Sequence, residues 1–481
     1  MSPSPYSLPA HYIVPEPELI FHPERSSDRD HHPLRGLLTY GPFSRSIITQ
    51  VCDPIRVAFV TAYGQGGLAT SLLSEVESRH MPKERRAYLL EFPGFQRLFG
   101  VRVVPAATTC HIELPSGLES DLARSQKPHI LLADTLTRAL SHLQANRNEF
   151  DVVLLVVPTA WEQWLVFRDE GEDFDLHDYL KAVTAARNLP LQILRETRAF
   201  TYPCRCSVMW RVAIALYCKA GGIPWKLADV EADTAHIGLS YALRSHPTDT
   251  QARFITCCSQ VFDADGVGLE FIAYDVDDVR VERNDPYLGR GEMRRVMSRS
   301  LALYQRRNAG RVPKRVVIHK STPFKPEEID GCFDAWPNTR GLDLIHIQQD
   351  VMWRGVQINP PQRSGAKGTP GRYPCRRGSY MQLDGRNVLL WTQGNVPMAG
   401  QKDFFKEGKA IPAPLLLSRF AGHGLFDQTC REVLGLCKMN WNHDGLYDRL
   451  PVTMAYAKVL ARTVKRMPHL APRPYQFRFL M

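Results

Sequence analysis

The sequence has 481 residues, 44% of them hydrophobic, and a formal net charge of +10 at pH 7. This length allows two or three domains of roughly 100–200 residues each. The apolar runs, such as the one that follows Asp151, are far shorter than the ~20 residues that a membrane span needs, so we expect buried strands instead. The positive charge suits a polyanionic partner, because Lys and Arg displace counterions from phosphates, but it does not identify one.

The first 46 residues are rich in Pro, His and charged residues and contain HPLRGLLTYGPFS, from His32 to Ser44. A Gly-Pro pair after an apolar run predicts a turn, and we interpret residues 1–46 as a linker segment. The chain does not open with a basic stretch followed by an apolar core, which argues against a secretory signal. The eleven cysteines lack zinc-finger spacing, so we expect reduced, mostly buried thiols in a cytoplasmic protein.

From about residue 50 to 220, short apolar runs alternate with helix-like segments. The runs include IRVAFVTAY from Ile55, DVVLLVVP from Asp151 and LPLQILRE from Leu189, and the segments between them have amphipathic helical patterns. This alternation predicts a parallel sheet flanked by helices, an α/β architecture of Rossmann-like type. The first run is not followed by G-x-G-x-x-G, so the sequence does not predict a dinucleotide site there.

The pattern changes after about residue 224. Three strand-like runs lead to a basic helical segment between Arg290 and Gln305, and two further strand-like runs follow it, from Arg315 and from Leu342. Strands, then a helix, then strands is the order of an RNase H-like fold. The arginines of the helical segment could form an ordinary solvated face or bind a polyanion, and the sequence leaves both interpretations open.

Three segments in order carry a resemblance to Argonaute proteins. ALYCKAGGIPWKL, from Ala215 to Leu227, is similar to the joint between the MID and PIWI domains. RVVIHKSTPFKPEEIDG, from Arg315 to Gly331, is similar to the strand and loop that hold a catalytic Asp in members that cut. The stretch from Lys438 to Pro468, which begins KMNWN, resembles the closing part of PIWI. The resemblance implies a Rossmann-like MID domain in residues 47–223 and an RNase H-like PIWI domain in residues 224–481.

The family binds the 5′-phosphate of a guide strand in a MID pocket of four side chains: an aromatic residue or His, a Lys, a Gln and a second Lys. The matching residues here are His177 or Tyr179, then Lys181, Gln192 and Lys219, with Arg211 beside Lys219 as a second cation. His177 and Lys181 are four residues apart and share a helix face. Whether His177 or Tyr179 stacks on the first base stays open. The alternative interpretation treats the lysines as surface residues and the tyrosine as a core residue.

The end of the chain, YQFRFLM, suggests a metal site. In several members of the family the terminal carboxylate helps to hold a divalent cation against the guide phosphate. Met481 would supply that carboxylate here. A hard cation such as Mg²⁺ bridges carboxylate and phosphate oxygens readily, so the resemblance implies bound magnesium at the guide 5′-phosphate.

Argonautes that cut hold two metal ions with acidic side chains. The first acid is expected as G-I-D, where this chain has Gly238-Leu239-Ser240, and the second follows a strand at the position of Ser321. Near the terminal helix, Lys458 occupies the place of an expected Asp or His. Two serines cannot anchor two magnesium ions and an ammonium would repel them. We therefore expect a catalytically inactive PIWI domain and no enzymatic activity.

The chain is too short for the N-terminal and PAZ domains of a long Argonaute and resembles a short prokaryotic one. That resemblance implies a sensor in antiviral and anti-plasmid defence, loaded with guide RNA and recognising single-stranded target DNA. Its expected partner is an effector with a PAZ-like region, a sirtuin-like or TIR NADase rather than a nuclease, in a heterodimer that oligomerises on activation and causes abortive infection. Two alternatives are a guide-directed endonuclease with displaced catalytic residues and a nucleic-acid-binding subunit that uses no guide.

Overall fold

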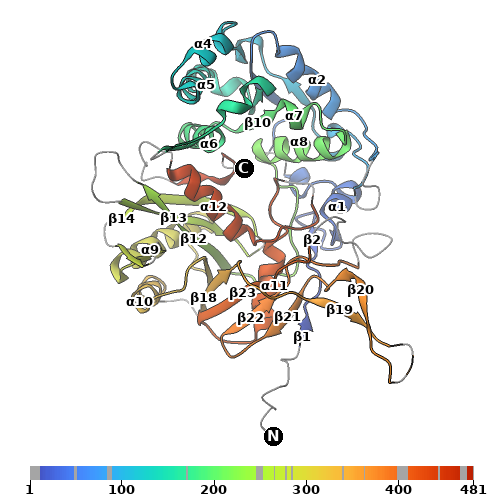
Figure 1. Cartoon of the computed structure of the whole chain (residues 1–481), viewed down its shortest axis with the longest axis vertical. Coiled ribbons are helices and arrows are strands. Elements are labelled where there is room, and N and C mark those ends of the chain that lie inside the picture. The colour runs from blue at the N-terminus through green and yellow to red at the C-terminus, as the bar shows by residue number, and fades with distance from the viewer. Residues whose placement is uncertain are drawn as a thin grey trace. The chain divides into compact units, whose positions relative to one another are not determined.

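The computed structural model describes the chain apart from residues 1–10, 48–50, 84–88, 170–171, 245–252, 265, 277–278, 283–284, 338–340, 362, 364, 398–409, 443–444, 466–473 and 480–481. The chain forms two compact units, whose elements are labelled in Figure 1. Unit 1 contains Met1–Leu19, Leu227–Asn440 and Gly445–Lys458. Unit 2 contains Ile20–Lys226, Trp441–Asp444 and Val459–Met481.

The division of the chain between residues 226 and 227 lies close to the predicted boundary between residues 223 and 224. Residues 1–46, interpreted as one linker segment, are divided between the two units at residue 19. The segment from Val459 onward is grouped with unit 2, although it was predicted as part of the second domain. The named domains and their limits stay predictions.

Unit 2 is built on a parallel sheet with the strand order β10-β7-β4-β5, in which β6 also pairs with β4. The strands are β4 (Ile55–Thr61), β5 (Val103–Pro105), β6 (His111–Glu113), β7 (Val152–Val157) and β10 (Leu191–Arg195). The longer helices are α2 (Gly66–Val76), α4 (Leu118–Arg124), α5 (Pro128–Ala145), α6 (Leu176–Arg187) and α8 (Arg205–Lys219). The predicted Rossmann-like architecture is confirmed.

Both faces of this sheet are covered by helices, which explains why every residue of β7 is buried. Val153, Leu155 and Val157 pack in one hydrophobic cluster with residues of α5 and α6. Helices α2 and α8 contact each other, and α2 contacts β4 while α8 contacts β10. The continuous apolar run of β7 is therefore the pattern of a strand in the middle of a three-layer α/β unit.

Shorter elements complete the part of the chain that runs from residue 19 to residue 227, together with its last residues. They are β2 (Leu19–Ile20), β3 (Arg29–Asp30), α1 (Pro33–Tyr40), η1 (Phe43–Ser46), α3 (Phe95–Phe99), η2 (Thr108–Cys110), η3 (Arg147–Glu149), η4 (Thr159–Trp164), β8 (Val166–Asp169), β9 (Glu172–Asp175), α7 (Glu196–Ala199), β11 (Lys226–Leu227), β24 (Tyr475–Gln476) and η5 (Phe477–Phe479). Helix α1 begins after His32, whose imidazole accepts hydrogen bonds from the amides of Leu34 and Arg35.

Unit 1 contains a mixed sheet in which the strands follow the order β1-β21-β22-β23-β18-β17-β12-β13-β14. These strands are β1 (His11–Ile13), β12 (Thr234–Arg244), β13 (Arg253–Phe262), β14 (Gly268–Val276), β17 (Arg315–Lys320), β18 (Gly341–Gln348), β21 (Ser379–Gln382), β22 (Asn387–Leu390) and β23 (Leu415–Ala421). The helices are α9 (Arg290–Arg307), α10 (Pro326–Ala335), α11 (Phe426–Leu436) and the part of α12 (Val452–Lys465) up to Lys458. Two hairpins are β15 (Val279–Glu282) with β16 (Asp285–Leu288) and β19 (Val356–Asn359) with β20 (Thr369–Pro374).

The chain order in unit 1 is that of an RNase H-like fold. The first three long strands, β12, β13 and β14, are antiparallel, α9 follows, and β17 and β18 then add in parallel beside β12. Alternate residues of β17 face opposite layers, because Val316 and Ile318 pack with α9 and α10 whereas Val317 packs with α11. The predicted RNase H-like fold is confirmed.

A buried ion pair cluster attaches the start of the described chain to unit 1. Glu16 contacts Arg377 at 2.5 Å and Lys438 at 2.6 Å, and the side chains of both basic residues are fully buried. Burial alone would raise the pKa of Glu16, but the charges of Arg377 and Lys438 lower it below its usual value. Lys438 also donates to the carbonyl of Pro17 at 2.9 Å. The lysine that opens the KMNWN motif therefore has a structural role in this chain.

Within the described part of the chain, no helix combines the length and hydrophobicity needed to cross a membrane. The cysteines whose side chains are described form no disulfide, and most of them are buried.

Candidate functional site

Two lysines predicted to bind phosphate are buried together in unit 2. Lys181 lies in the middle of α6 and is 2% exposed, and Lys219 is the last residue of α8 and is 0% exposed. Their amino groups are within hydrogen-bond reach of each other. The Nζ atom of Lys181 also donates to the carbonyl oxygen of Leu191, at the start of β10, at 2.9 Å. The interpretation of these residues as surface lysines is therefore wrong.

Burial of this pair changes the protonation of both amines. Burial lowers the pKa of Lys181 to about 8, although its hydrogen bond to Lys219 favours the charged form. Burial, together with the charge of Lys181, holds the pKa of Lys219 well below its usual value. In this arrangement the ammonium of Lys181 donates a hydrogen bond to the amino group of Lys219, which is less basic than usual. An anion that bridged the two groups would offset both the desolvation and the repulsion.

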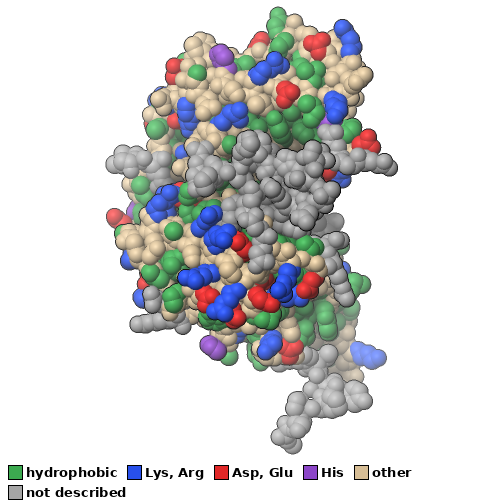
Figure 2. Space-filling model, turned by 90° about the vertical axis from the view of Figure 1, so that its left-hand side faces the viewer, with side chains coloured by type: hydrophobic (Ala, Val, Ile, Leu, Met, Phe, Trp, Pro, Cys, Tyr) green, Lys and Arg blue, Asp and Glu red, His purple; other side chains and the backbone are tan. Residues whose placement is uncertain are grey.

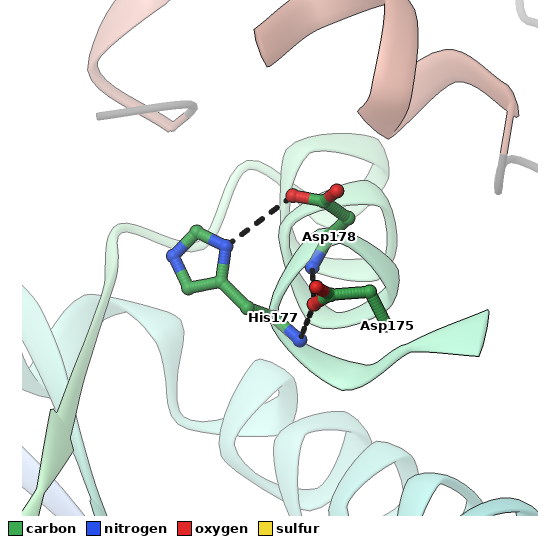
Figure 3. A group of neighbouring side chains, drawn as sticks. All are labelled: Asp175, His177 and Asp178. Carbon is green, nitrogen blue, oxygen red and sulfur yellow. Dashed lines mark hydrogen bonds and ion pairs between the residues drawn. The ribbon is translucent and has the colours of Figure 1, made fainter. Parts of the chain in front are cut away.

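Helix α6 begins with three polar side chains that lie close together, Asp175, His177 and Asp178 (Figure 3). Their possible ligand atoms all lie within 4.8 Å of one another, which is compatible with a metal ion. Other interactions explain the group. Asp175 caps the helix by accepting from the amides of His177 at 2.9 Å and Asp178 at 3.2 Å, and Asp178 pairs with Arg462 of α12 at 3.2 Å. The cluster is accounted for by helix capping and ion pairing.

The two candidates for stacking on the first guide base have different surroundings. His177 lies one turn before Lys181, and its side chain is 47% exposed. Tyr179 is partly buried against the hydrophobic cluster of unit 2, and its hydroxyl accepts from Thr137 of α5 at 3.5 Å. Residues two apart on a helix point to nearly opposite sides, so Tyr179 faces α5 while His177 shares the side of Lys181.

Gln192 and Arg211 occupy different positions around the lysine pair. Gln192 follows directly on Leu191, the residue that accepts from Lys181, and its amide nitrogen donates to the carbonyl of Ile193 at 3.2 Å. Arg211 lies on α8 two turns before Lys219 and is exposed, and it donates to the hydroxyl of Ser207 at 3.1 Å. Gln192 is thus next in sequence to the carbonyl that Lys181 contacts, whereas Arg211 lies at the surface of α8.

The predicted metal ligand Met481 lies outside the described residues. The last described helical turn, η5, contacts both α6 and α8, which are the helices that carry Lys181 and Lys219. The end of the described chain therefore lies against the two helices that carry the lysine pair. A magnesium ion at the lysine pair would need carboxylate or phosphate oxygens, because two amino groups repel a cation.

The three positions predicted to replace catalytic acids lie together in unit 1. Strands β12 and β17 are parallel with Leu239 opposite Lys320, and Ser240 and Ser321 follow directly on this pair. The hydroxyl of Ser240 donates to the carbonyl of Ala457 in α12 at 2.8 Å, so the next residue, Lys458, belongs to the turn of α12 that contacts β12. Lys458 is exposed and donates to the side-chain oxygen of Gln349, just after β18, at 3.0 Å. These positions present two hydroxyl groups and one ammonium.

The loop after β17 is fixed by a buried ion pair beside Ser321. Lys320 contacts both carboxylate oxygens of Glu328 at 2.5 and 2.6 Å, and both side chains are fully buried. Glu328 also accepts from the hydroxyl of Tyr241 at 3.0 Å and from the amide of Lys325 at 3.0 Å. Burial lowers the pKa of Lys320 despite the neighbouring carboxylate. The ion pair joins β17 to α10 and has a structural role.

The arginines of α9 are largely matched by acids. Arg290 pairs with Asp334, Arg295 with Glu292, and Arg306 and Arg307 with Glu270. In the lower half of Figure 2, on the side where α9 and α10 lie, Lys and Arg side chains are interspersed with Asp and Glu. This pattern favours an ordinary solvated face over a polyanion site.

The fold is that of Argonaute proteins. The sequence matches no protein-family model and no curated protein. Among solved structures, the chain is similar to Clostridium butyricum Argonaute bound to a guide DNA with a 5′ deoxycytidine and a 19-mer target DNA, with a TM-score of 0.63, 16% identity, and coverage of 95% of this chain and 53% of that one. It is also similar to Aa-Ago with externally bound siRNA, with a TM-score of 0.60, 14% identity, and coverage of 98% and 56%.

A further similar structure is that of A. aeolicus Argonaute, with a TM-score of 0.55, 14% identity, and coverage of 91% of this chain and 52% of that one. This chain therefore spans about half the length of these Argonautes. Together the comparisons show an Argonaute-like fold in which a Rossmann-like unit and an RNase H-like unit are both present.

Proposed function

We propose that this chain is a guide-loaded sensor of short prokaryotic Argonaute type. It binds the 5′-phosphate of a guide RNA and recognises complementary single-stranded target DNA without cutting it. The observation that carries this proposal is the buried pair of Lys181 and Lys219 within an Argonaute-like fold. Two amines held together out of water are unfavourable unless an anion joins them, and a terminal phosphate is a dianion of suitable charge.

The surrounding residues have complementary roles in this proposal. His177, exposed one turn before Lys181, stacks on the first base, and Gln192 donates to a phosphate oxygen. Arg211 meets the following phosphates at the surface of α8. A magnesium ion, if bound, would be held by the carboxylate of Met481 and the guide phosphate, and would supply further neutralisation of charge. The lysine pair supports phosphate recognition independently of the metal.

The three positions of unit 1 where catalytic acids were expected support a role without nuclease activity. Two-metal phosphoryl displacement needs carboxylates to hold the ions, and Ser240, Ser321 and Lys458 supply none. Target recognition is instead transmitted to a partner effector with a PAZ-like region, of sirtuin-like or TIR NADase type. The complex acts in the cytoplasm as a heterodimer that oligomerises when target binds, in defence against invading DNA.

The proposal is tested by the nucleic acids that copurify with the chain. The full chain is expressed with and without the protein encoded beside it, and bound nucleic acids are extracted, digested with RNase or DNase, and sequenced. We expect short RNAs of defined length that accept a 5′ label only after phosphatase treatment. A Lys181→Met/Lys219→Met variant should lose them, and Lys127→Met, an exposed lysine of the same unit, should retain them. Nucleic acid of random length with free 5′-hydroxyl ends would contradict the proposal.

A further inference from the structure

A polar cavity lies in unit 2 away from the lysine pair, with a volume of about 560 Å³. Its lining comes from α1, η1, α3 and the chain between α2 and α3, whereas the lysine pair lies on α6 and α8. The cationic side chains of the lining are Arg45, Arg79 and Arg97, and the acidic one is Glu91. A volume in this range is typical of small-molecule sites. The cavity is therefore a candidate for a ligand that the guide-binding role does not involve.

The position of Arg45 is fixed by two glycines in the left-handed region. Gly41 has a φ of +80° and Gly100 a φ of +76°. A Cβ atom at Gly41 would lie 3.1 Å from a terminal nitrogen of Arg45, and one at Gly100 would lie 2.9 Å from its Nε. Only glycine leaves room for the guanidinium to lie across both turns. The backbone therefore orients Arg45 at the wall of the cavity.

The charges of the cavity do not cancel. Arg79 forms a two-point ion pair with Glu91, which neutralises one arginine and holds it in place. The guanidinium groups of Arg45 and Arg97 make no hydrogen bond or ion pair to any residue that the structure describes. Two planar cations with ten N–H donors between them thus remain available to an anion, in line with the five donors that each guanidinium carries.

The rest of the lining suits a flat aromatic group. Tyr40 contributes a phenol ring, and Leu37, Pro93 and Leu98 contribute apolar surface. Guanidinium groups bind phosphate in a bidentate manner, and an aromatic ring beside them can stack on a base. A carboxylate-rich peptide would use the arginines but would leave this apolar and aromatic surface without a complementary group.

We propose that this arginine-lined cavity binds a phosphate-bearing nucleotide, either as a free mononucleotide or as one unit of a nucleic-acid strand. Arg45 and Arg97 contact the phosphate, Arg79 is oriented by Glu91 at the rim, and Tyr40 stacks on the base. The proposal goes beyond guide loading and does not depend on it, because the cavity and the lysine pair share no residue.

Binding is measured by titration calorimetry with AMP, adenosine, a 5′-hydroxyl DNA oligonucleotide and a glutamate-rich peptide, using the full chain with Lys181→Met/Lys219→Met, which removes the proposed guide-phosphate contacts. We expect AMP or the oligonucleotide to bind at least tenfold more tightly than adenosine. Tight binding of AMP identifies a free nucleotide as the ligand, and binding of the oligonucleotide alone identifies a strand. Binding of the peptide without either phosphate ligand, or of none of the four, would overturn the proposal.

Variants separate this cavity from general charge attraction. Arg45→Ala/Arg97→Ala should weaken phosphate-ligand binding at least tenfold, and Arg97→Glu should do so without touching the glycine turns. Arg124→Ala is the matched control, because Arg124 is an exposed arginine of α4 in the same unit. All of these variants are made in the Lys181→Met/Lys219→Met background, so that AMP bound through its 5′-phosphate at the lysine pair does not contribute. Equal losses in Arg124→Ala and Arg97→Glu, or an unaffected Arg97→Glu, would contradict the assignment.

Discussion

The ammonium of Lys181 and the amine of Lys219 are buried together and hydrogen-bonded to each other in the interior of unit 2. Folding has placed two like groups where each opposes the charge of the other, at a cost in stability. Such an arrangement is typical of binding sites, where a perturbed pKa marks a group held ready for a ligand. The burial and repulsion of the two amines destabilise the unliganded protein, and we propose that bound phosphate relieves both effects.

Replacing Lys219 by an apolar side chain of similar length should stabilise the unliganded protein. Lys219→Met removes the desolvated amine and the repulsion with Lys181, so we expect the midpoint of thermal unfolding to rise by roughly 2–6 °C. The measurement is a thermal melt of guide-free protein. Lys127→Met, at an exposed site before α5, should change the midpoint by less than about 1 °C. A clear fall for Lys219→Met would show that the folded state satisfies this lysine fully.

Guide binding should be coupled to proton uptake above neutral pH. The pKa of Lys181 in the free protein is about 8 and is lowered by burial, and a bound phosphate would raise it. The affinity for a 5′-phosphorylated guide should therefore fall as pH rises through about 8, by up to tenfold per pH unit for each proton taken up on binding. The phosphate itself is already a dianion in this range. Dissociation constants from pH 7 to 9.5 test this, with a 5′-hydroxyl guide as the flat control.

The lowered pKa of Lys181 should make the free energy of unfolding rise with pH, whereas guide affinity falls. A lysine with a lowered folded-state pKa releases its proton on folding, so its cost is fully present below pH 8. The cost disappears as pH rises from about 8 towards the unfolded value, where both states are neutral. The contribution of this lysine to the free energy of unfolding should therefore increase over that window. Denaturant titrations of wild type and Lys181→Met at pH 7.5 and 9.5 isolate it, and identical pH dependence in both would contradict the assignment.

The guide-loaded protein should leave both strands intact. Ser240 lies within β12, Ser321 directly after β17 and Lys458 on the turn of α12 that contacts Ser240, and none of the three offers a carboxylate to a metal. A labelled target incubated with a complementary guide and Mg²⁺ or Mn²⁺ should remain full-length on a denaturing gel. One defined cut, retained in Ser240→Ala, would show that other residues carry nuclease activity.

The ion pair behind Ser321 should be essential to the fold of unit 1. Glu328→Ala leaves the ammonium of Lys320 buried without its carboxylate and should cost about 3–5 kcal/mol of stability. Its neighbour Glu327 is exposed, so Glu327→Ala should change stability by less than about 0.5 kcal/mol. Denaturant unfolding of both variants provides the comparison. A mild effect of Glu328→Ala would mean that water or another acid replaces the carboxylate.

The architectures of both units could be predicted from the pattern of apolar residues and the order of the elements. The six-residue apolar run of β7 predicts a strand covered on both faces, and the order of strands around the basic helix predicts the RNase H-like unit. The burial of Lys219 was not predicted. Every residue of α8 from Val212 to Lys219 is buried, so the helix lacks the polar stripe that marks a surface helix and gives no periodic signal for where a charged residue points.

Sequence spacing explains which site residues could be found. Four-residue spacing relates His177 to Lys181, because both lie on one helix. Arg45 and Arg97, by contrast, are far apart in sequence but line one cavity, where Gly41 and Gly100 leave room for the Arg45 side chain. No local sequence pattern indicates that these residues lie near one another. A cavity built from separate segments can therefore be found only in the folded structure.

The central claim is most directly tested by comparing two guides that differ only at the 5′ end. Equilibrium binding of one RNA with a 5′-phosphate and the same RNA with a 5′-hydroxyl is measured for wild type and for Lys181→Met/Lys219→Met. Each charge-assisted contact contributes on the order of 1.5–3 kcal/mol, so wild type should prefer the phosphorylated guide by at least tenfold. The variant should bind both guides equally. Equal binding of the two guides by wild type, or an unchanged preference in the variant, would contradict the account.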